Sequence, residues 1–169
     1  MHVLGLDLAR IHAALNELPA LLVVAVLFDL GGWIAKRESL KVVALWTLWA
    51  GVIGGWGAVA AGELAKRAIE HSDAIRELLR THERVAISTM TLFTVILGWK
   101  LLRRARLGRW DELLARGLSV AGVVGVLWTQ AVGSRLVFNH AAGIETKTIK
   151  AELLDRQQHE HRHDGPVPR

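Results

Sequence analysis

The sequence predicts an all-α membrane protein in which four transmembrane helices pack as a four-helix bundle. The first observation is composition: 51% of the 169 residues are hydrophobic and 22% are charged, with a mean hydropathy of +0.29. The second is segregation, because the charged residues stand in clusters that separate long uncharged runs. The third is length, since those runs approach the ~20 residues that an α-helix needs to cross the hydrocarbon core.

Three of the spans are clear from charge alone. Val42–Gly62 and Gly117–Ser134 contain no charged residue. A shorter run lies between Arg84 and Lys100, whose long side chains can snorkel to the two interfaces. The four spans are expected at about residues 15–35, 42–62, 84–102 and 114–136.

The first span is less uniform, because Glu17 and Asp29 interrupt it near its two ends. Two acids, Asp29 and Glu63 at the end of the second span, point first to a function such as a proton relay, because a carboxylate inside a membrane is costly. For Asp29, an ion pair with Lys36 or Arg103 at the interface explains the residue at least equally well.

The basic residues predict the orientation of the bundle. The loops between spans one and two and between spans three and four are short and strongly basic, which the positive-inside rule assigns to the cytoplasm. Tryptophans near the same edge are typical of an interfacial belt. In a bacterium, both termini would then be periplasmic in a multi-pass protein of the inner membrane. The residues concerned are Lys36, Arg37, Lys41, Lys100, Arg103, Arg104, Arg106 and Arg109, with Trp33, Trp46, Trp99 and Trp110.

Polar segments on the opposite side predict surface helices and a tail. Residues 63–81 mix both signs of charge around an apolar stripe, which favours one or two short periplasmic helices on the membrane surface. Residues 144–156 have a weak helical pattern, and the His-rich end predicts a flexible C-terminal tail. We therefore divide the chain into a four-span membrane domain, residues 1–143, and a polar tail, residues 144–169.

Composition also narrows the function. The chain has no cysteine, which excludes disulfides, thiolate metal sites, iron–sulfur clusters and covalent c-type haem. A net charge of +5 does not indicate nucleic-acid binding here, because the basic residues stand at the ends of spans. The N-terminus lacks a signal-peptide pattern, so the first span is expected to remain. No nucleophile–base set or phosphate loop is visible, which argues against an autonomous enzyme.

Small residues at helical spacing predict close packing between spans. Gly51 and Gly55 form one small-xxx-small pair, and Ala121 and Gly125 form another. Such pairs let helix backbones approach closely in a membrane. Packing within the bundle is the simpler interpretation, and a homodimer face is the alternative.

Histidines carry most of the functional information. His12, His82 and His140 stand at the periplasmic ends of three spans, where imidazoles from different helices approach one another as a haem or a divalent metal requires. Interfacial histidines without a ligand are the alternative. His71 lies eleven residues before His82, which is ~16 Å along an unbroken helix, so the two can share a metal only if the chain turns between them.

Two further groups complete the predicted site. Arg84 and Arg135 lie within one or two turns of candidate ligands and are expected to pair with haem propionates. The tail histidines His159, His161 and His163 suggest capture of Cu²⁺, Ni²⁺ or Zn²⁺, because imidazole suits all three ions.

Two end motifs resemble a known family. The stretch Ile11-His-Ala-Ala-Leu-Asn-Glu-Leu-Pro-Ala-Leu, followed by Phe28-Asp29, resembles the opening of the domain-of-unknown-function family numbered 2231, which comprises small bacterial four-span membrane proteins. The stretch Gly133-Ser-Arg-Leu-Val-Phe-Asn-His-Ala-Ala-Gly-Ile resembles its closing pattern. The likeness covers about residues 11–144.

The resemblance implies a redox setting with Rieske-type or cytochrome partners, and no known reaction. The matching positions are His12, Pro19, Asp29, His82 and His140. The sequence departs from the family pattern at Ala13, where proline is usual, at Glu17, where a second histidine is common, and at Ala141, where glycine is usual.

Three functions follow from these observations. The first is a b-type haem or metal-binding subunit in respiratory electron transfer, although b-haem ligands commonly lie deeper in a bundle than these histidines are expected to. The second is divalent-metal handling through the tail and bundle histidines. The third is a cofactor-free structural or assembly subunit of a membrane complex.

Overall fold

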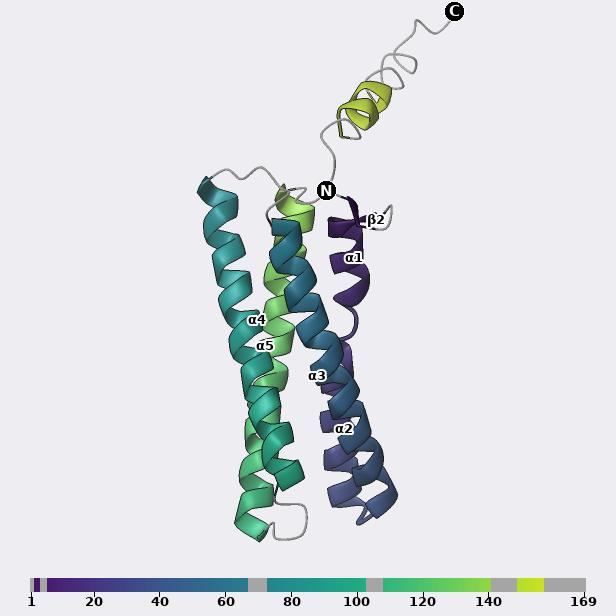
Figure 1. The fold of residues 1–169 in the computed structure, drawn as a ribbon, viewed down its shortest axis with the longest axis vertical. Coiled ribbons are helices and arrows are strands. Elements are labelled where there is room, and N and C mark those ends of the chain that lie inside the picture. The colour runs from purple at the N-terminus through teal and green to yellow at the C-terminus, as the bar shows by residue number, and fades with distance from the viewer. Residues whose placement is uncertain (1, 4–5, 67–72, 103–107, 141–148, 157–169) are drawn as a thin grey trace, which may run out of the picture.

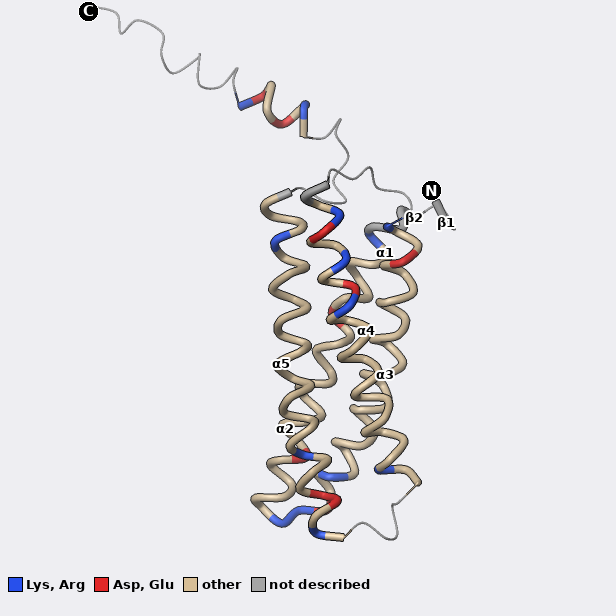
Figure 2. The backbone as a smooth tube through the Cα atoms, turned by 90° about the vertical axis from the view of Figure 1, so that its left-hand side faces the viewer, with Lys and Arg blue, Asp and Glu red and all other residues tan. Residues whose placement is uncertain are grey.

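The computed structural model is a bundle of long helices with charged residues gathered toward its two ends (Figures 1 and 2). It describes residues 2–3, 6–66, 73–102, 108–140 and 149–156. The elements are β1 (His2–Val3), β2 (Leu6–Asp7), α1 (Leu8–Leu15), α2 (Ala20–Ile34), α3 (Glu38–Lys66), α4 (Asp73–Leu102) and α5 (Arg109–His140). β1 and β2 form one short antiparallel pair, and residues 149–156 are helical.

Four helical stretches are long and apolar enough to cross a membrane: Arg10–Ile34, Glu38–Lys66, Ile75–Leu102 and Arg109–Asn139. They confirm the predicted all-α four-span bundle. Large apolar side chains point outward from it, and each of these is more than half exposed, as contact with lipid requires: Leu27, Trp46, Ile53, Val124 and Leu127.

The spans run up and down as two hairpins, α2–α3 and α4–α5 (Figure 1). We call the end that holds α1, the last turn of α3, the first turn of α4 and the last turn of α5 the terminal end. The opposite end, where α2 joins α3 and α4 approaches α5, is the hairpin end. The tight α2–α3 connection places Lys36 in the left-handed region at φ 54°, and Arg37 N donates to Gly32 O at 2.9 Å. These features are those of a helix C-cap, which reverses the chain in few residues.

The first span is two helices rather than one. Residues Asn16–Pro19 separate α1 from α2, and successive short-range hydrogen bonds such as Leu18 N to Leu15 O (3.0 Å) cross the break. Pro19 explains the interruption, because its ring cannot donate to the preceding turn and it restricts the residue before it. The break lets α1 follow α3 while α2 packs against both α3 and α5.

The surface helices expected in residues 63–81 are replaced by longer spans. α3 continues to Lys66 and α4 begins at Asp73, while residues 67–72 lie outside the described part of the chain. The apolar stripe that suggested a surface helix, represented by Ile75 and Leu78, is half-buried along α4. A continuous helix satisfies the backbone groups of this segment within itself, so the stripe serves bundle packing.

Glycines allow the close helix contacts that the sequence predicts. A Cβ on Gly51 would lie 2.7 Å from Leu22 Cδ2 of α2, and one on Gly55 would lie 2.5 Å from Met90 Sδ of α4. Leu22 is fully buried, as are Phe93 and Ile96. The small-residue pair on α3 is therefore used inside the bundle, and the homodimer face stays a prediction.

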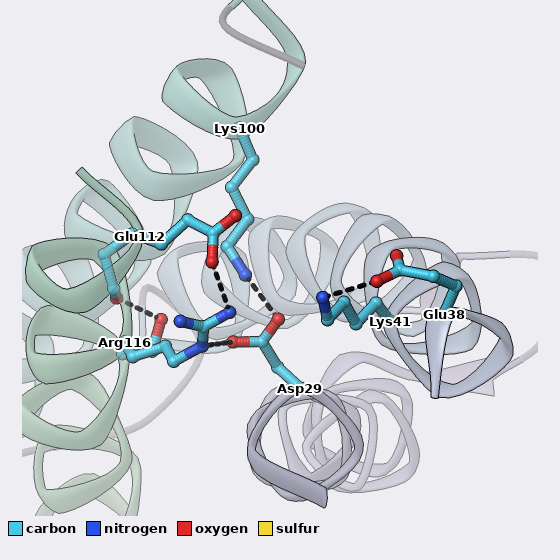
Figure 3. A network of polar contacts seen from close by, with 8 residues as sticks. Asp29, Glu38, Lys41, Lys100, Glu112 and Arg116 are labelled. Atoms are coloured by element: carbon cyan, nitrogen blue, oxygen red, sulfur yellow. Dashed lines mark hydrogen bonds and ion pairs between the residues drawn. The ribbon is translucent and has the colours of Figure 1, made fainter. Parts of the chain in front are cut away.

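At the hairpin end, Asp29 holds three helices together (Figure 3). Asp29 Oδ1 lies 3.0 Å from Lys100 Nζ of α4, and Oδ2 lies 3.3 Å from Arg116 Nε of α5. Arg116 also donates to Glu112 Oε2 at 3.0 Å and stacks on the Trp33 ring, 5.3 Å from its centroid. The partners expected for Asp29 were Lys36 or Arg103. Arg103 lies outside the described residues, and the cations that pair with Asp29 are Lys100 and Arg116 of the facing helices.

Replacing Asp29 with alanine is expected to destabilise the bundle by about 3 kcal/mol, because the buried Arg116 and the partly buried Lys100 lose the carboxylate that compensates them. Chemical unfolding of the detergent-solubilised protein, followed by circular dichroism, measures the loss. Lys41→Ala is the matched control, since it removes a pair with Glu38, whose side chain is 80% exposed. The control should lose less than about 1 kcal/mol. Equal losses in the two variants would contradict the structural role of Asp29.

Candidate cofactor site

A cavity of about 1040 Å³ lies at the terminal end, between α1, α3, α4 and α5. Its wall is mainly apolar, and the polar groups on it include His12, Asn16, Glu17, His82 and Gln130. The break at Asn16–Pro19 accounts for the space, because α1 follows α3 instead of closing against α5 as α2 does. On the α3 side the lining residues include the small Ala58 and Gly62, whose side chains fill little of the cavity.

His12 and His82 reach this cavity from different helices in the same chemical arrangement. His12 Nδ1 lies 3.0 Å from the Ala58 carbonyl of α3, and His82 Nδ1 lies 3.1 Å from the Thr129 carbonyl of α5. A carbonyl oxygen can only accept, so each neutral ring carries its proton on Nδ1 and its lone pair on Nε2. Within the described residues, no hydrogen bond engages either Nε2.

Each imidazole is seated against a glycine. A Cβ on Gly62 would lie 2.8 Å from His12 Cε1, and one on Gly133 would lie 3.1 Å from His82 Cε1. The backbone carbonyl fixes one edge of each ring and the glycine fixes the packing beside it, so both orientations are set before any ligand binds.

The two helices extend farther than the sequence suggested. His82 was expected to open the third span, but α4 begins at Asp73, which places His82 about 13 Å along the helix at 1.5 Å per residue. Thr129, its partner, is likewise well inside α5, which continues to His140.

A second polar contact lies on the cavity wall, where the first span is broken. Asn16 Nδ2 donates to Gln130 Oε1 at 3.0 Å, and Gln130 Nε2 donates back to the Asn16 carbonyl at 3.1 Å. This pair ties the break in the first span to the middle of α5. Neither residue was predicted from the sequence as part of the site. Gln130 could have been, because it is an amide side chain inside an uncharged membrane-spanning run.

The structure places the other predicted site residues as follows. His140 is the last residue of α5, and its side chain lies outside the description, as do His71 and the tail histidines His159, His161 and His163. Arg84 and Arg135 are exposed, and the cavity wall does not include them.

The wall includes other cations, Arg10 and Lys66. Lys66 Nζ is held between Glu63 Oε2 at 2.6 Å and Glu83 Oε2 at 2.9 Å. Its charge is therefore balanced by neighbouring carboxylates. Among the described side chains, no three histidine or acidic groups gather as a metal-binding cluster.

A comparison with protein-family models bears directly on the resemblance of the end motifs. The model described as "Predicted membrane protein (DUF2231)" matches residues 9–146. The chain belongs to this family. The match confirms the suggested resemblance and covers all four spans together with the cavity. Searches of curated proteins and of solved structures gave no match.

Gly62→Ala is expected to displace the His12 ring, because the new Cβ would stand 2.8 Å from Cε1. Overpacking of this kind typically costs about 1–3 kcal/mol. Gly57→Ala on the same helix is the control, since a Cβ there meets nothing within 4 Å. The control should be neutral or more stable by up to about 1 kcal/mol through helix propensity. Unfolding midpoints of the two variants in detergent give the comparison, and a Gly62→Ala protein as stable as the control would refute the seating of His12.

Proposed function

We propose that this DUF2231 protein is a b-type haem-binding subunit of the membrane, with His12 and His82 as axial ligands, and that it serves one-electron transfer in a respiratory chain. One observation carries the proposal. The two histidines line the same cavity, and each has Nδ1 committed to a backbone carbonyl, which leaves Nε2 as the available donor. Ligating histidines in metalloproteins usually have this second hydrogen bond, which orients the ring and raises its basicity.

The number of ligands favours haem over a bare metal ion. A protein-only zinc or copper site needs three or four donors, whereas the described side chains offer no such cluster. A porphyrin brings four nitrogens of its own, so two imidazoles from facing helices complete the coordination of its iron. Because the chain has no cysteine, attachment would be non-covalent, which is the b-type.

The cavity also suits a large flat ligand. Sites for small molecules and cofactors commonly occupy about 300–1,000 Å³ with mainly apolar walls, and this cavity is about 1040 Å³ with such a wall. When bound, haem would supply the one-electron couple. The chain's own residues would orient the iron ligands, exclude lipid and offer Arg10 to the propionates in place of the predicted Arg84 and Arg135.

The orientation belongs to the proposal as well. The basic residues at the hairpin end favour a cytoplasmic location for that end in a bacterial inner membrane, with both termini and the cavity toward the periplasm.

A cysteine-labelling experiment tests this orientation. The chain has no cysteine, so a single Ser39→Cys substitution reports on the hairpin end of α3 alone. In intact cells it should react with a membrane-impermeant maleimide only after permeabilisation, whereas Asn139→Cys at the end of α5 should react at once. The opposite pattern would reverse the orientation.

The test of function is a reduced-minus-oxidised absorption spectrum of protein purified from haem-replete cells. Wild type should bind one haem per chain and show the sharp α-band of a low-spin, six-coordinate b-type haem. His12→Asn and His82→Asn should each abolish that spectrum. Asparagine Nδ2 keeps a donor near the position of histidine Nδ1, so it preserves the bond to Ala58 or Thr129 while removing the ligand nitrogen.

His140→Asn is the matched control, and the assignment of two axial ligands predicts that it keeps the spectrum. Folding of every variant is checked by circular dichroism and elution volume. A wild-type protein that is folded and free of haem would refute the proposal. So would a His82→Asn protein that keeps a six-coordinate spectrum.

A further inference from the structure

The two carboxylates of the first span have opposite environments. Asp29 is buried at the hairpin end and lies within ion-pair distance of Lys100 and Arg116. Glu17 stands at the break between α1 and α2, on the wall of the cavity. Among the described residues, neither an ion pair nor a side-chain hydrogen bond engages Glu17. A structural role accounts for Asp29 and leaves Glu17 unexplained.

Position makes Glu17 unusual. It lies seven residues inside a 25-residue span that begins at Arg10, where an uncompensated charge is costly. Its side chain is exposed rather than enclosed. It shares the cavity wall with both His12 and His82. A carboxylate that lacks a fixed counter-charge and can exchange protons responds readily to a change of charge in its surroundings.

We propose that Glu17 is the redox-linked proton acceptor of the site, an inference that rests on the proposed haem function. With haem bound, one electron from a one-electron donor would add a negative charge to the cavity. The cavity wall is mainly apolar, so that charge and the Glu17 carboxylate would repel each other more strongly than in bulk water. Glu17 would therefore take one proton from water at the terminal end as the electron arrives, its carboxylate becoming a carboxylic acid, and would release that proton when the electron leaves.

Other charged groups on the wall are accounted for. α1 contributes Arg10 and His12, and α4 contributes His82 and Glu83. α3 contributes Glu63 and Lys66, and Lys66 lies between Glu63 and Glu83. The wall residues from α5 include Thr129, Gln130 and Ser134 and carry no titratable side chain. Glu17 is thus the wall carboxylate without a cation beside it in the described part of the chain.

The test is a potentiometric titration of the purified holoprotein at several pH values, with the α-band as the readout. Wild type should show a midpoint potential that falls as pH rises, by up to about 59 mV per unit, which is the value for one proton per electron. Glu17→Gln should flatten this slope over the same interval while keeping one haem per chain. Glu17→Asp should restore the slope, because it restores the carboxylate.

Two controls separate this role from a general effect of charge. Glu77→Gln removes an acid of α4 that is 71% exposed and lies off the cavity wall, and it should leave the slope unchanged. Glu63→Gln removes the wall carboxylate that pairs with Lys66, and it should also keep the slope.

A slope lost in Glu63→Gln and kept in Glu17→Gln would overturn the inference, as would a pH-independent wild type. A wild type without haem would overturn the proposed function, and this inference with it, whereas a haem-loaded Glu17→Gln protein with the wild-type slope would overturn the inference alone.

Discussion

Hydrocarbon offers no hydrogen-bond partners, so a polar group in these spans is costly unless the protein, or a ligand that the protein holds, pairs with it. That constraint explains why both cavity histidines donate Nδ1 to helix carbonyls, Ala58 for His12 and Thr129 for His82. These bonds cross between helices, so they also fix how α1 sits on α3 and how α4 sits on α5. The two Nε2 atoms each keep a lone pair, which is the group of each ring that remains for binding a ligand.

The two ends of the bundle meet the same constraint differently. At the hairpin end, Asp29, Lys100, Arg116 and Glu112 compensate one another, and the result is a fixed junction of α2, α4 and α5 (Figure 3). At the terminal end, the break at Pro19 moves α1 away from α5 and leaves a cavity whose wall carries Glu17 without a paired cation among the described residues. Ion pairs join the helices at one end, and a cavity separates them at the other.

Local patterns predicted the parts of this architecture that depend on hydrophobicity and charge. Uncharged runs located three of the spans and an apolar segment with two acids located the first, and the glycine pair of α3 predicted packing within the bundle. Patterns of sequence failed where distant helices decide the outcome. Nothing local marks Arg116 as a partner of Asp29, and the Asn16–Gln130 pair joins positions 114 residues apart. His12 and His82 were predicted individually, but their common orientation depends on carbonyls of two other helices. The same reason explains why Arg84 and Arg135, close to the histidines in sequence, are not on the cavity wall.

The proposed site requires His12 and His82 to direct Nε2 toward one bound iron. Crystals of the purified holoprotein, measured on both sides of the iron absorption edge, test this arrangement. We expect a single anomalous peak inside the cavity, within bonding distance of both Nε2 atoms, while each Nδ1 stays on its carbonyl. An iron peak elsewhere in the molecule, or a cavity that holds lipid while both imidazoles turn away, would contradict it.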